Sequence, residues 1–178
     1  MGIHEIVLPE TKPETEWVRG RPLRKISPKR THSRLQFALA ARLERWANGR
    51  GEVAVEWRFR LAPPGELRRP LVPDVAYVSD QRLRALSDAE VETPPIAPDI
   101  AVEILSPYDR RADVEDKIGV YVRAGSSLVI VVDPQRCAVE LHDRDRTVLL
   151  DDADAIEHPA LPDFSYPVCD LFASAKLG

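Results

Sequence analysis

The sequence predicts an α/β (α+β) fold in which helices flank a mixed β-sheet. Two segments repeat apolar residues at helical spacing, and short β-branched runs that are typical of strands lie between and after them. The chain has 178 residues, of which 44% are hydrophobic and 30% charged, so it can form one domain with a hydrophobic core. We expect this single domain over residues 17–178 and a loose polar leader over residues 1–16.

The first expected elements are a short strand and a long helix. The strand lies within residues 17–29, before a turn at Ser27-Pro28. Thr31 is the predicted N-cap of a helix over residues 33–48, and Asn48-Gly49 ends it. The predicted buried face of this helix consists of residues at helical spacing and three neighbours: Leu35, Leu39, Leu43 and Trp46, with Phe37, Ala38 and Ala41.

Three strands are expected in the middle of the chain. Residues 53–61 alternate apolar and polar side chains, which predicts one continuous half-buried strand. Two shorter strands are expected at residues 72–78 and 99–105, with a helical turn in residues 80–88 between them.

The last third of the chain predicts a helix followed by strands. Residues 111–124 have a helical period and end at Gly125, and the aliphatic run 128–132 is typical of a central buried strand. A hairpin formed by residues 137–142 and 146–150, and a short helix over residues 168–175, complete the expected elements.

Two of the predicted strands carry an acid within an apolar run: Asp74 in residues 72–78 and Glu103 in residues 99–105. Carboxylates are rare inside strands and costly to bury unless they are paired or bind a cation. On neighbouring strands, about 4.8 Å apart, the two acids can share a divalent metal ion. Asp99 lies roughly 13 Å along the strand from Glu103, which is too far for a shared metal ion.

A basic residue is expected near these acids. Lys117 lies on the predicted helix that follows Glu103, and it shares a stripe of that helix with Asp113 and Tyr121. A divalent ion would polarise a phosphoryl oxygen and lower the pKa of a bound water, and a lysine would stabilise developing charge. The set predicts phosphodiester hydrolysis with Asp74, Glu103 and Lys117 as catalytic residues.

Basic residues are concentrated near the N-terminus, although the net charge of −4 does not by itself indicate nucleic-acid binding. Residues 19–34 contain no acid. Their basic side chains are candidate phosphate-binding groups: Arg19, Arg21, Arg24, Lys25, Lys29, Arg30 and Arg34. The alternative for this segment is an ordinary solvated face.

The proposed catalytic residues also have purely structural alternatives. The two acids could be strand-edge carboxylates that pair with Arg110 or Arg111. Lys117 could be a solvated lysine paired with Asp113, one turn earlier on the helix.

Two further polar residues are accessory candidates, together with Asp113 and Tyr121. His32 could touch a scissile phosphate or a metal-bound water, or it could form only local hydrogen bonds at the start of its helix. Glu56 could extend the acidic cluster, or it could pair with an arginine neighbour on its strand such as Arg58 or Arg60.

The order of these residues along the chain resembles the motif order of the Uma-two family of restriction-endonuclease-like proteins, within the PD-(D/E)XK nuclease superfamily. The resemblance rests on Pro73-Asp74 and on Glu103 in Val-Glu-Ile-Leu-Ser-Pro, and it covers about residues 17–175. Further matching residues lie on both sides of this pair: His32, Asp113, Lys117, Tyr121, Gly125, residues 130–134, Leu161-Pro162-Asp163-Phe164 and Leu171-Phe172.

The resemblance implies a restriction-endonuclease-like fold and an activity that depends on Mg²⁺ or Mn²⁺. Asp74, Glu103 and the backbone carbonyl of Ile104 would hold the metal ion. The superfamily motif has the form Glu-x-Lys, and this chain has Leu105 where that lysine would stand. By the same resemblance, Lys117 on the following helix would replace it.

We therefore expect a metal-dependent endonuclease that hydrolyses phosphodiester bonds of nucleic acid, with DNA favoured over RNA as its partner and a homodimer as one candidate assembly. The alternative is a non-catalytic module on the same fold that binds nucleic acid or protein. The sequence has no apolar run long enough for a membrane helix and no signal peptide. We therefore expect a cytoplasmic protein without a membrane partner.

Overall fold

A six-stranded mixed β-sheet forms the centre of the computed structural model, which describes residues 4–176. Its strand order is β10-β9-β8-β7-β6-β3, and only β7 and β8 pair in parallel. The strands are β3 (Gly51–Val55), β6 (Val75–Ser79), β7 (Ile100–Ile104), β8 (Leu128–Asp133), β9 (Ala138–His142) and β10 (Thr147–Leu150). The predicted mixed sheet flanked by helices is confirmed.

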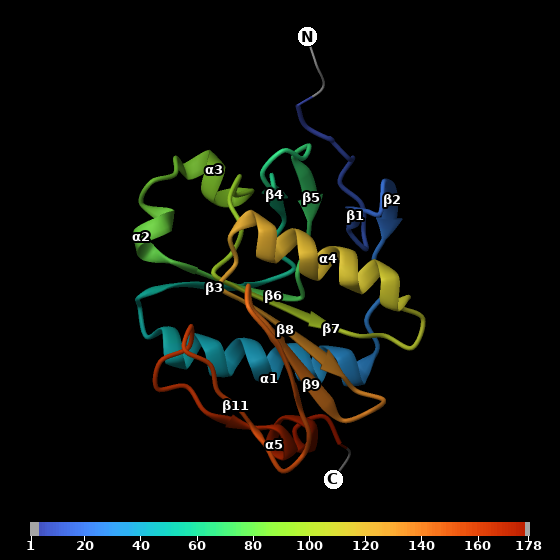
Figure 1. The fold of residues 1–178 in the computed structure, drawn as a ribbon, viewed down its shortest axis with the longest axis vertical. Helices are drawn as coiled ribbons and strands as arrows, with labels where there is room; N and C mark the ends of the chain where they lie inside the picture. Colours follow the sequence, from blue (N-terminus) through green and yellow to red (C-terminus); the bar gives the residue numbers. More distant parts are fainter. Residues whose placement is uncertain (1–3, 177–178) are drawn as a thin grey trace.

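Helices cover both faces of this sheet (Figure 1). One face packs against α1 (Arg30–Ala47) and α5 (Val168–Ala173), and the other face packs against α4 (Arg111–Ala124). Two hydrophobic cores result because side chains on each strand alternate between the faces. Val102, for example, lies in the core beneath α1, and its neighbour Ala101 lies in the core beneath α4.

Smaller elements surround the sheet. Three two-stranded ribbons form: β1 (Thr15–Val18) with β2 (Arg21–Arg24), β4 (Phe59–Leu61) with β5 (Arg69–Leu71), and β11 (Ala155–Ile156) with β12 (Tyr166–Pro167). The short helices α2 (Asp80–Leu83) and α3 (Asp88–Glu92) connect β6 to β7. The first two ribbons lie on the α4 side of the sheet (Figure 1). They bring N-terminal residues close to one end of β6 and β7.

The long N-terminal helix begins earlier than predicted, and Thr31 is not its N-cap. The cap residue is Lys29, and Arg30 in the first turn donates a hydrogen bond to the carbonyl oxygen of Ala175 (2.9 Å). Lys29 forms no side-chain cap, and the Ser33 N–H donates to the Lys29 carbonyl (3.0 Å), so the helical hydrogen bonds start earlier than predicted. Phe37, predicted on the buried face, is 66% exposed because it points away from the stripe of Leu35, Leu39 and Leu43.

The strand predicted over residues 53–61 is divided in two. β3 ends at Val55, and β4 begins at Phe59 in a different sheet. Glu56 lies at the break with a φ of 51°, in the left-handed region that residues with a Cβ seldom occupy. The continuous strand was therefore a wrong prediction, and the break has a role in the site described below.

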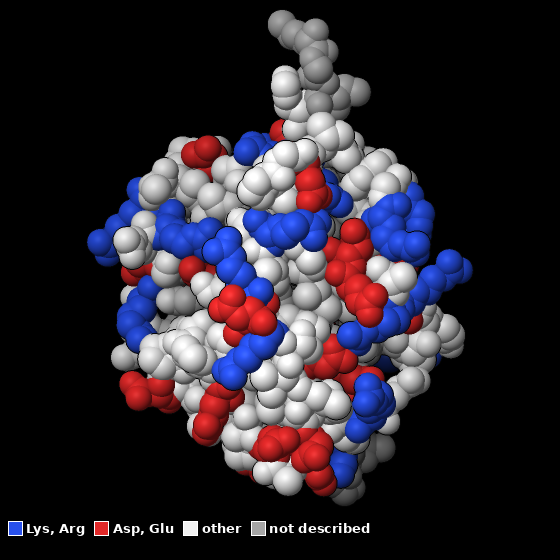
Figure 2. Space-filling model, viewed as in Figure 1, with Lys and Arg blue, Asp and Glu red and all other residues white. Residues whose placement is uncertain are grey.

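The predicted helix over residues 111–124 is confirmed residue for residue, and the strand at 128–132 is central as expected. The predicted hairpin is formed by β9 and β10. In the part of the chain that the structure describes, no helix has the length and apolar character needed to cross a membrane. Figure 2 shows the face that carries α4, on which basic and acidic side chains are interspersed.

Candidate functional site

Asp74 and Glu103 lie opposite each other at the adjoining ends of β6 and β7. The antiparallel register pairs Val75 with Val102, which places Asp74 opposite Glu103 one step further along. Because Val102 points into the core beneath α1, Glu103 points to the other face, toward α4, whereas Asp74, just before β6, contacts His32 of α1. Their residues are only 2% and 6% exposed. Asp99, at the far end of β7, instead accepts a hydrogen bond from the backbone N–H of Ser79 (2.7 Å).

Helix α4 holds Glu103 from above. The Nζ of Lys117 donates to Glu103 Oε2 (2.6 Å) and to Glu16 Oε2 (2.9 Å), and the Tyr121 hydroxyl donates to Glu103 Oε1 (2.9 Å). Lys117 and Tyr121 share a stripe because they are four residues apart on the helix. Asp113, the proposed partner of Lys117 in the structural alternative, instead accepts two hydrogen bonds from Arg21 (2.8 and 3.1 Å). The stripe therefore brings its lysine and tyrosine to the acids, while Asp113 anchors the β1–β2 ribbon.

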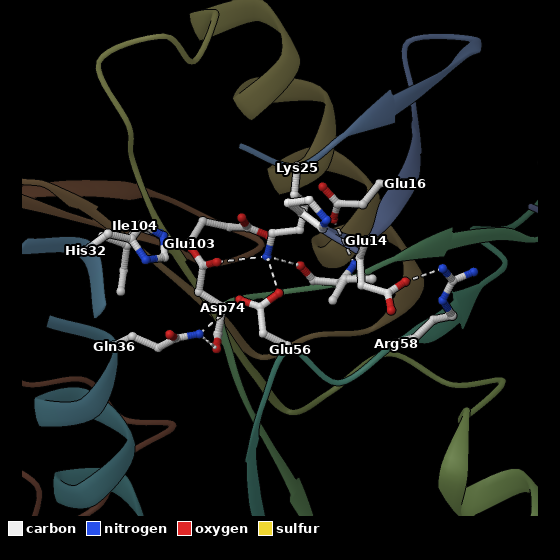
Figure 3. A network of polar contacts seen from close by, with 12 residues as sticks. Glu14, Glu16, Lys25, His32, Gln36, Glu56, Arg58, Asp74, Glu103 and Ile104 are labelled. Carbon is white, nitrogen blue, oxygen red and sulfur yellow. Dashed lines mark hydrogen bonds and ion pairs between the residues drawn. The ribbon is translucent and has the colours of Figure 1, made fainter. Parts of the chain in front are cut away.

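A second lysine, Lys25, lies on Asp74. It follows β2, and its Nζ donates to Asp74 Oδ1 (2.8 Å), Glu56 Oε2 (3.0 Å) and the carbonyl oxygen of Val72 (2.9 Å) (Figure 3). Its side chain is only 11% exposed. Three oxygens thus satisfy all three N–H donors of the ammonium group. Glu56 lies where the strand is interrupted between β3 and β4, and its carboxylate reaches Lys25 there.

Helix α1 supplies the remaining contacts to Asp74 from one stripe. His32 Nε2 lies 3.3 Å from Asp74 Oδ2, and Gln36 donates to the Asp74 carbonyl (2.8 Å) and to Glu56 Oε1 (2.9 Å). The other ring nitrogen of His32, Nδ1, is buried and has no hydrogen-bond partner within residues 4–176. The Ile104 N–H donates to Asp74 Oδ2 (2.6 Å), which ties the carboxylate to β7.

The electrostatics of the cluster separate the two central acids. Burial raises the pKa of Asp74, but the charge of Lys25 and the hydrogen bond from His32 outweigh it, so that the pKa lies below its usual value. Burial raises the pKa of Glu103 to about 7, because the nearby charges of Glu16 and Asp74 add to it and Lys117 offsets only part. Asp74 therefore stays ionised in the metal-free protein, whereas Glu103 titrates near neutral pH.

Both lysines are held in the charged form. Burial disfavours the ammonium group in each case, but the surrounding carboxylates outweigh it and raise the pKa of Lys25 and of Lys117. For Lys25 the largest attraction comes from Asp74, and for Lys117 it comes from Glu103. Each of the two central acids therefore has its own lysine.

Sequence reasoning missed Glu16 and Gln36. Glu16 is only 2% exposed; besides the bond to Lys117, its Oε1 accepts a hydrogen bond from the Val72 backbone N–H (2.7 Å). It fell within the predicted leader, although an acid in Thr15–Val18 carries the same signal as the acids in the central strands. Gln36 could have been found from its position four residues after His32 on one helical stripe.

Of the arginines that offered structural alternatives, Arg111, Arg58 and Arg60 have other partners, and Arg110 forms no ion pair among the described residues. Arg111 pairs with Glu140 (2.7 Å) and Glu115 (2.9 Å), and it forms no ion pair with the two central acids. Arg58 pairs with Glu14 and Arg60 with Glu5, so Glu56 is left to Lys25 and Gln36.

Most basic groups in residues 19–34 have partners within the chain. Arg19 and Arg21 pair with Asp113, Arg24 donates to the Lys12 carbonyl, and Lys25 is bound as described. Arg30 and Arg34 donate to the carbonyls of Ala175 and Ser174. Lys29 lies over the ring of Tyr108, with Nζ 5.5 Å from the ring centroid.

A cavity of about 520 Å³ leads from the surface to the two acids. Asp74, Glu103 and Lys117 lie among its lining residues, together with Lys25 and His32. One wall is formed by residues 23–29 and the other by residues 105–110. The arrangement is a recessed acidic pair with a lysine on each acid, reached through a cavity large enough for a small ligand.

Comparisons with known proteins bear on the family and the fold of this chain. The family model Uma2, described as "Putative restriction endonuclease", matches residues 5–170. The fold is similar to the crystal structure of a putative nuclease belonging to DUF820 from Anabaena variabilis ATCC 29413, with a TM-score of 0.84. That match covers 95% of both chains at 23% sequence identity, and it shows likeness of fold. No match was found among curated proteins.

Proposed function

Because this chain belongs to the Uma2 family of putative restriction endonucleases, we propose that it is a metal-dependent endonuclease that hydrolyses phosphodiester bonds of DNA. One observation carries the proposal: Asp74 and Glu103 lie opposite each other on adjacent strands, nearly buried, with Lys117 bonded to Glu103. Families of this kind use a divalent ion, and the acids form a set of hard oxygen donors that suits Mg²⁺ or Mn²⁺.

The charge of the cluster fits a divalent cation. It contains the carboxylates of Glu16, Glu56, Asp74 and Glu103 and the ammonium groups of Lys25 and Lys117. With every acid ionised and His32 neutral, two negative charges remain in excess, and one Mg²⁺ would neutralise them. Within residues 4–176, no three acidic, histidine or cysteine side chains form a ready-made metal cage. This is consistent with two carboxylates whose remaining ligands are backbone and water.

In the proposed site, Asp74, Glu103 and the carbonyl of Ile104 would hold Mg²⁺ or Mn²⁺. The bound ion would polarise a phosphoryl oxygen and lower the pKa of a coordinated water. Lys117 is fixed by Glu103 and Glu16, and its ammonium group orients the attacking water and stabilises charge on the phosphate. The unpartnered Nδ1 of His32, when protonated, would donate a hydrogen bond to a phosphate oxygen.

Other residues around the site act on it indirectly. Tyr121 and Gln36 orient the two acids, and Asp113 holds the β1–β2 ribbon that brings Lys25 and Glu16 into place. The basic residues of the segment 19–34 that border the cavity would contact phosphate groups beside the scissile bond. A homodimer would present two such sites.

The proposal is tested by cleavage of plasmid and single-stranded DNA in Mn²⁺ or Mg²⁺, with Glu103→Gln and Asp74→Asn beside the wild type. Asp99→Asn is the matched control, because Asp99 flanks β7 at the end far from the site. We expect both site variants to lose cleavage and the control to keep it. Cleavage that survives in both site variants contradicts the proposal, and DNA binding without cleavage supports the non-catalytic module.

A further inference from the structure

The acids lie at the bottom of a recess. Asp74, Glu103 and Lys117 are 2%, 6% and 7% exposed, and the cavity walls of residues 23–29 and 105–110 rise on two sides of them. A DNA duplex is stiff, with a persistence length of about 50 nm, and it presents its phosphates on a convex surface. A flexible single strand can bring a phosphate to the bottom of such a recess with much less distortion.

The upper walls of the cavity are mostly apolar. Leu23, Ile26 and Pro28 line one side, and Leu105 and Pro107 line the other. These apolar side chains favour the faces of a nucleobase, while the basic residues of the same walls, such as Lys29 and Arg110, suit its phosphate. The volume of about 520 Å³ lies within the range of pockets that enclose small organic ligands.

An aromatic ring stands at the rim of the cavity. Tyr108 is 68% exposed, and its loop is closed by hydrogen bonds from the Ser106 N–H to Asp109 Oδ2 (2.7 Å) and from the Asp109 N–H to the Ser106 carbonyl (3.1 Å). The loop therefore holds the backbone that carries the exposed ring. Lys29 reaches the ring from the opposite wall, 5.5 Å from its centroid. An exposed ring beside a cation is the arrangement on which unpaired bases stack.

Part of the basic charge of the N-terminal segment is paired with acids of the chain itself. Proteins that grip a duplex typically neutralise about 6–10 phosphates. Most basic groups of residues 19–34 are bound to carboxylates or carbonyls of the chain itself. Lys29 and Arg110 line the cavity and form no ion pair within residues 4–176. The face in Figure 2 also shows mixed charges and no continuous basic surface.

From these four observations we infer that the site takes single-stranded DNA, with one unpaired base in the cavity against Tyr108 and its phosphate directed toward Asp74 and Glu103. The inference rests on the proposed function for the identity of the reacting group, and it names the substrate class of that site. Intact duplex DNA is the substrate that it excludes.

The test is binding of a fluorescently labelled 12-nucleotide single strand, and of a hairpin duplex of the same length, measured by anisotropy in EDTA. We expect the wild type to bind the single strand at least tenfold more tightly. Tyr108→Ala should weaken single-strand binding by about 5- to 150-fold, the range for loss of one stacked base, and Tyr108→Trp should retain it. Phe37→Ala is the control, because Phe37 is similarly exposed but does not line the cavity.

Equal or tighter binding of the duplex overturns the inference, as does unchanged single-strand binding by Tyr108→Ala or no binding of the single strand at low salt. The outcome is separate from that of the proposed function, because the assay contains no metal ion and no cleavage. Single-strand binding without metal-dependent cleavage leaves the inference standing and removes the nuclease activity. Cleavage of the duplex as fast as the single strand supports the nuclease activity and overturns the inference of a single-stranded substrate.

Discussion

Replacing Lys25 with methionine is the most direct test of how the cluster is stabilised. Methionine has a similar length but no charge, so the variant removes three hydrogen bonds, to Asp74, Glu56 and the Val72 carbonyl. The Lys25 side chain is 11% exposed and that of Asp74 is 2% exposed, so solvent does not replace the lost partner.

The expected loss of stability follows from this burial. Breaking a buried ion pair by removing one partner costs about 3–5 kcal/mol, because the remaining charge is left uncompensated. For a chain of this size, each kcal/mol corresponds to roughly 2–4 °C in Tm. We therefore expect the Tm of metal-free Lys25→Met to fall by about 6–20 °C.

A divalent ion should restore part of this loss. At a concentration 100 times Kd, a ligand of the native state stabilises it by about 2.7 kcal/mol. In the wild type, the Lys25 ammonium group is already bonded to Asp74 Oδ1, so Mn²⁺ has to displace the lysine from that oxygen. We expect Mn²⁺ to raise the Tm of the variant more than that of the wild type.

The assay is thermal unfolding followed by circular dichroism, with and without Mn²⁺. Lys29→Met is the control, because Lys29 comes from the same segment but lies over Tyr108 at the surface. The reasoning is refuted if metal-free Lys25→Met melts within about 2 °C of the wild type. It is also refuted if Mn²⁺ stabilises the variant no more than the wild type.

Three further outcomes are expected. In the metal-free protein the pKa of Glu103 is raised from 4.5 to about 7, so the folded state favours the protonated carboxyl group. The stabilisation from this protonation is complete below pH 4.5 and is lost as the pH rises through 7. Since metal binding needs the ionised carboxylate, calorimetry should show weaker Mn²⁺ binding at pH 6 than at pH 8, and equal affinity would contradict this. Tyr121→Phe removes the hydroxyl that donates to Glu103, and urea unfolding should show a loss of about 1–3 kcal/mol. Leu39→Ala, in the fully buried stripe of α1, should cost about 2–5 kcal/mol, whereas the exposed Phe37→Ala should change the free energy of unfolding by less than about 0.5 kcal/mol.

The elements that the sequence predicted correctly have local causes. The helix over residues 111–124 ends at Gly125, whose φ of 112° suits glycine, and its period alone identifies the buried face. The aliphatic run in β8 matches its burial on both faces of the sheet. The prediction of one continuous strand over residues 53–61 was wrong where distant contacts act: Glu56, at the break, accepts hydrogen bonds from Lys25 and Gln36.

The same division holds for the candidate site. The sequence by itself determined that Asp74 and Glu103 are unusual strand acids and that Lys117 and Tyr121 share a helical stripe, because side-chain direction repeats every two residues in strands and every three to four in helices. Only the tertiary structure showed that Glu16 joins Lys117 across 101 residues and that Lys25 joins Asp74 across 49. These pairings depend on where the β1–β2 ribbon docks. That docking is set by contacts such as Arg21 with Asp113, which no local period in the sequence encodes.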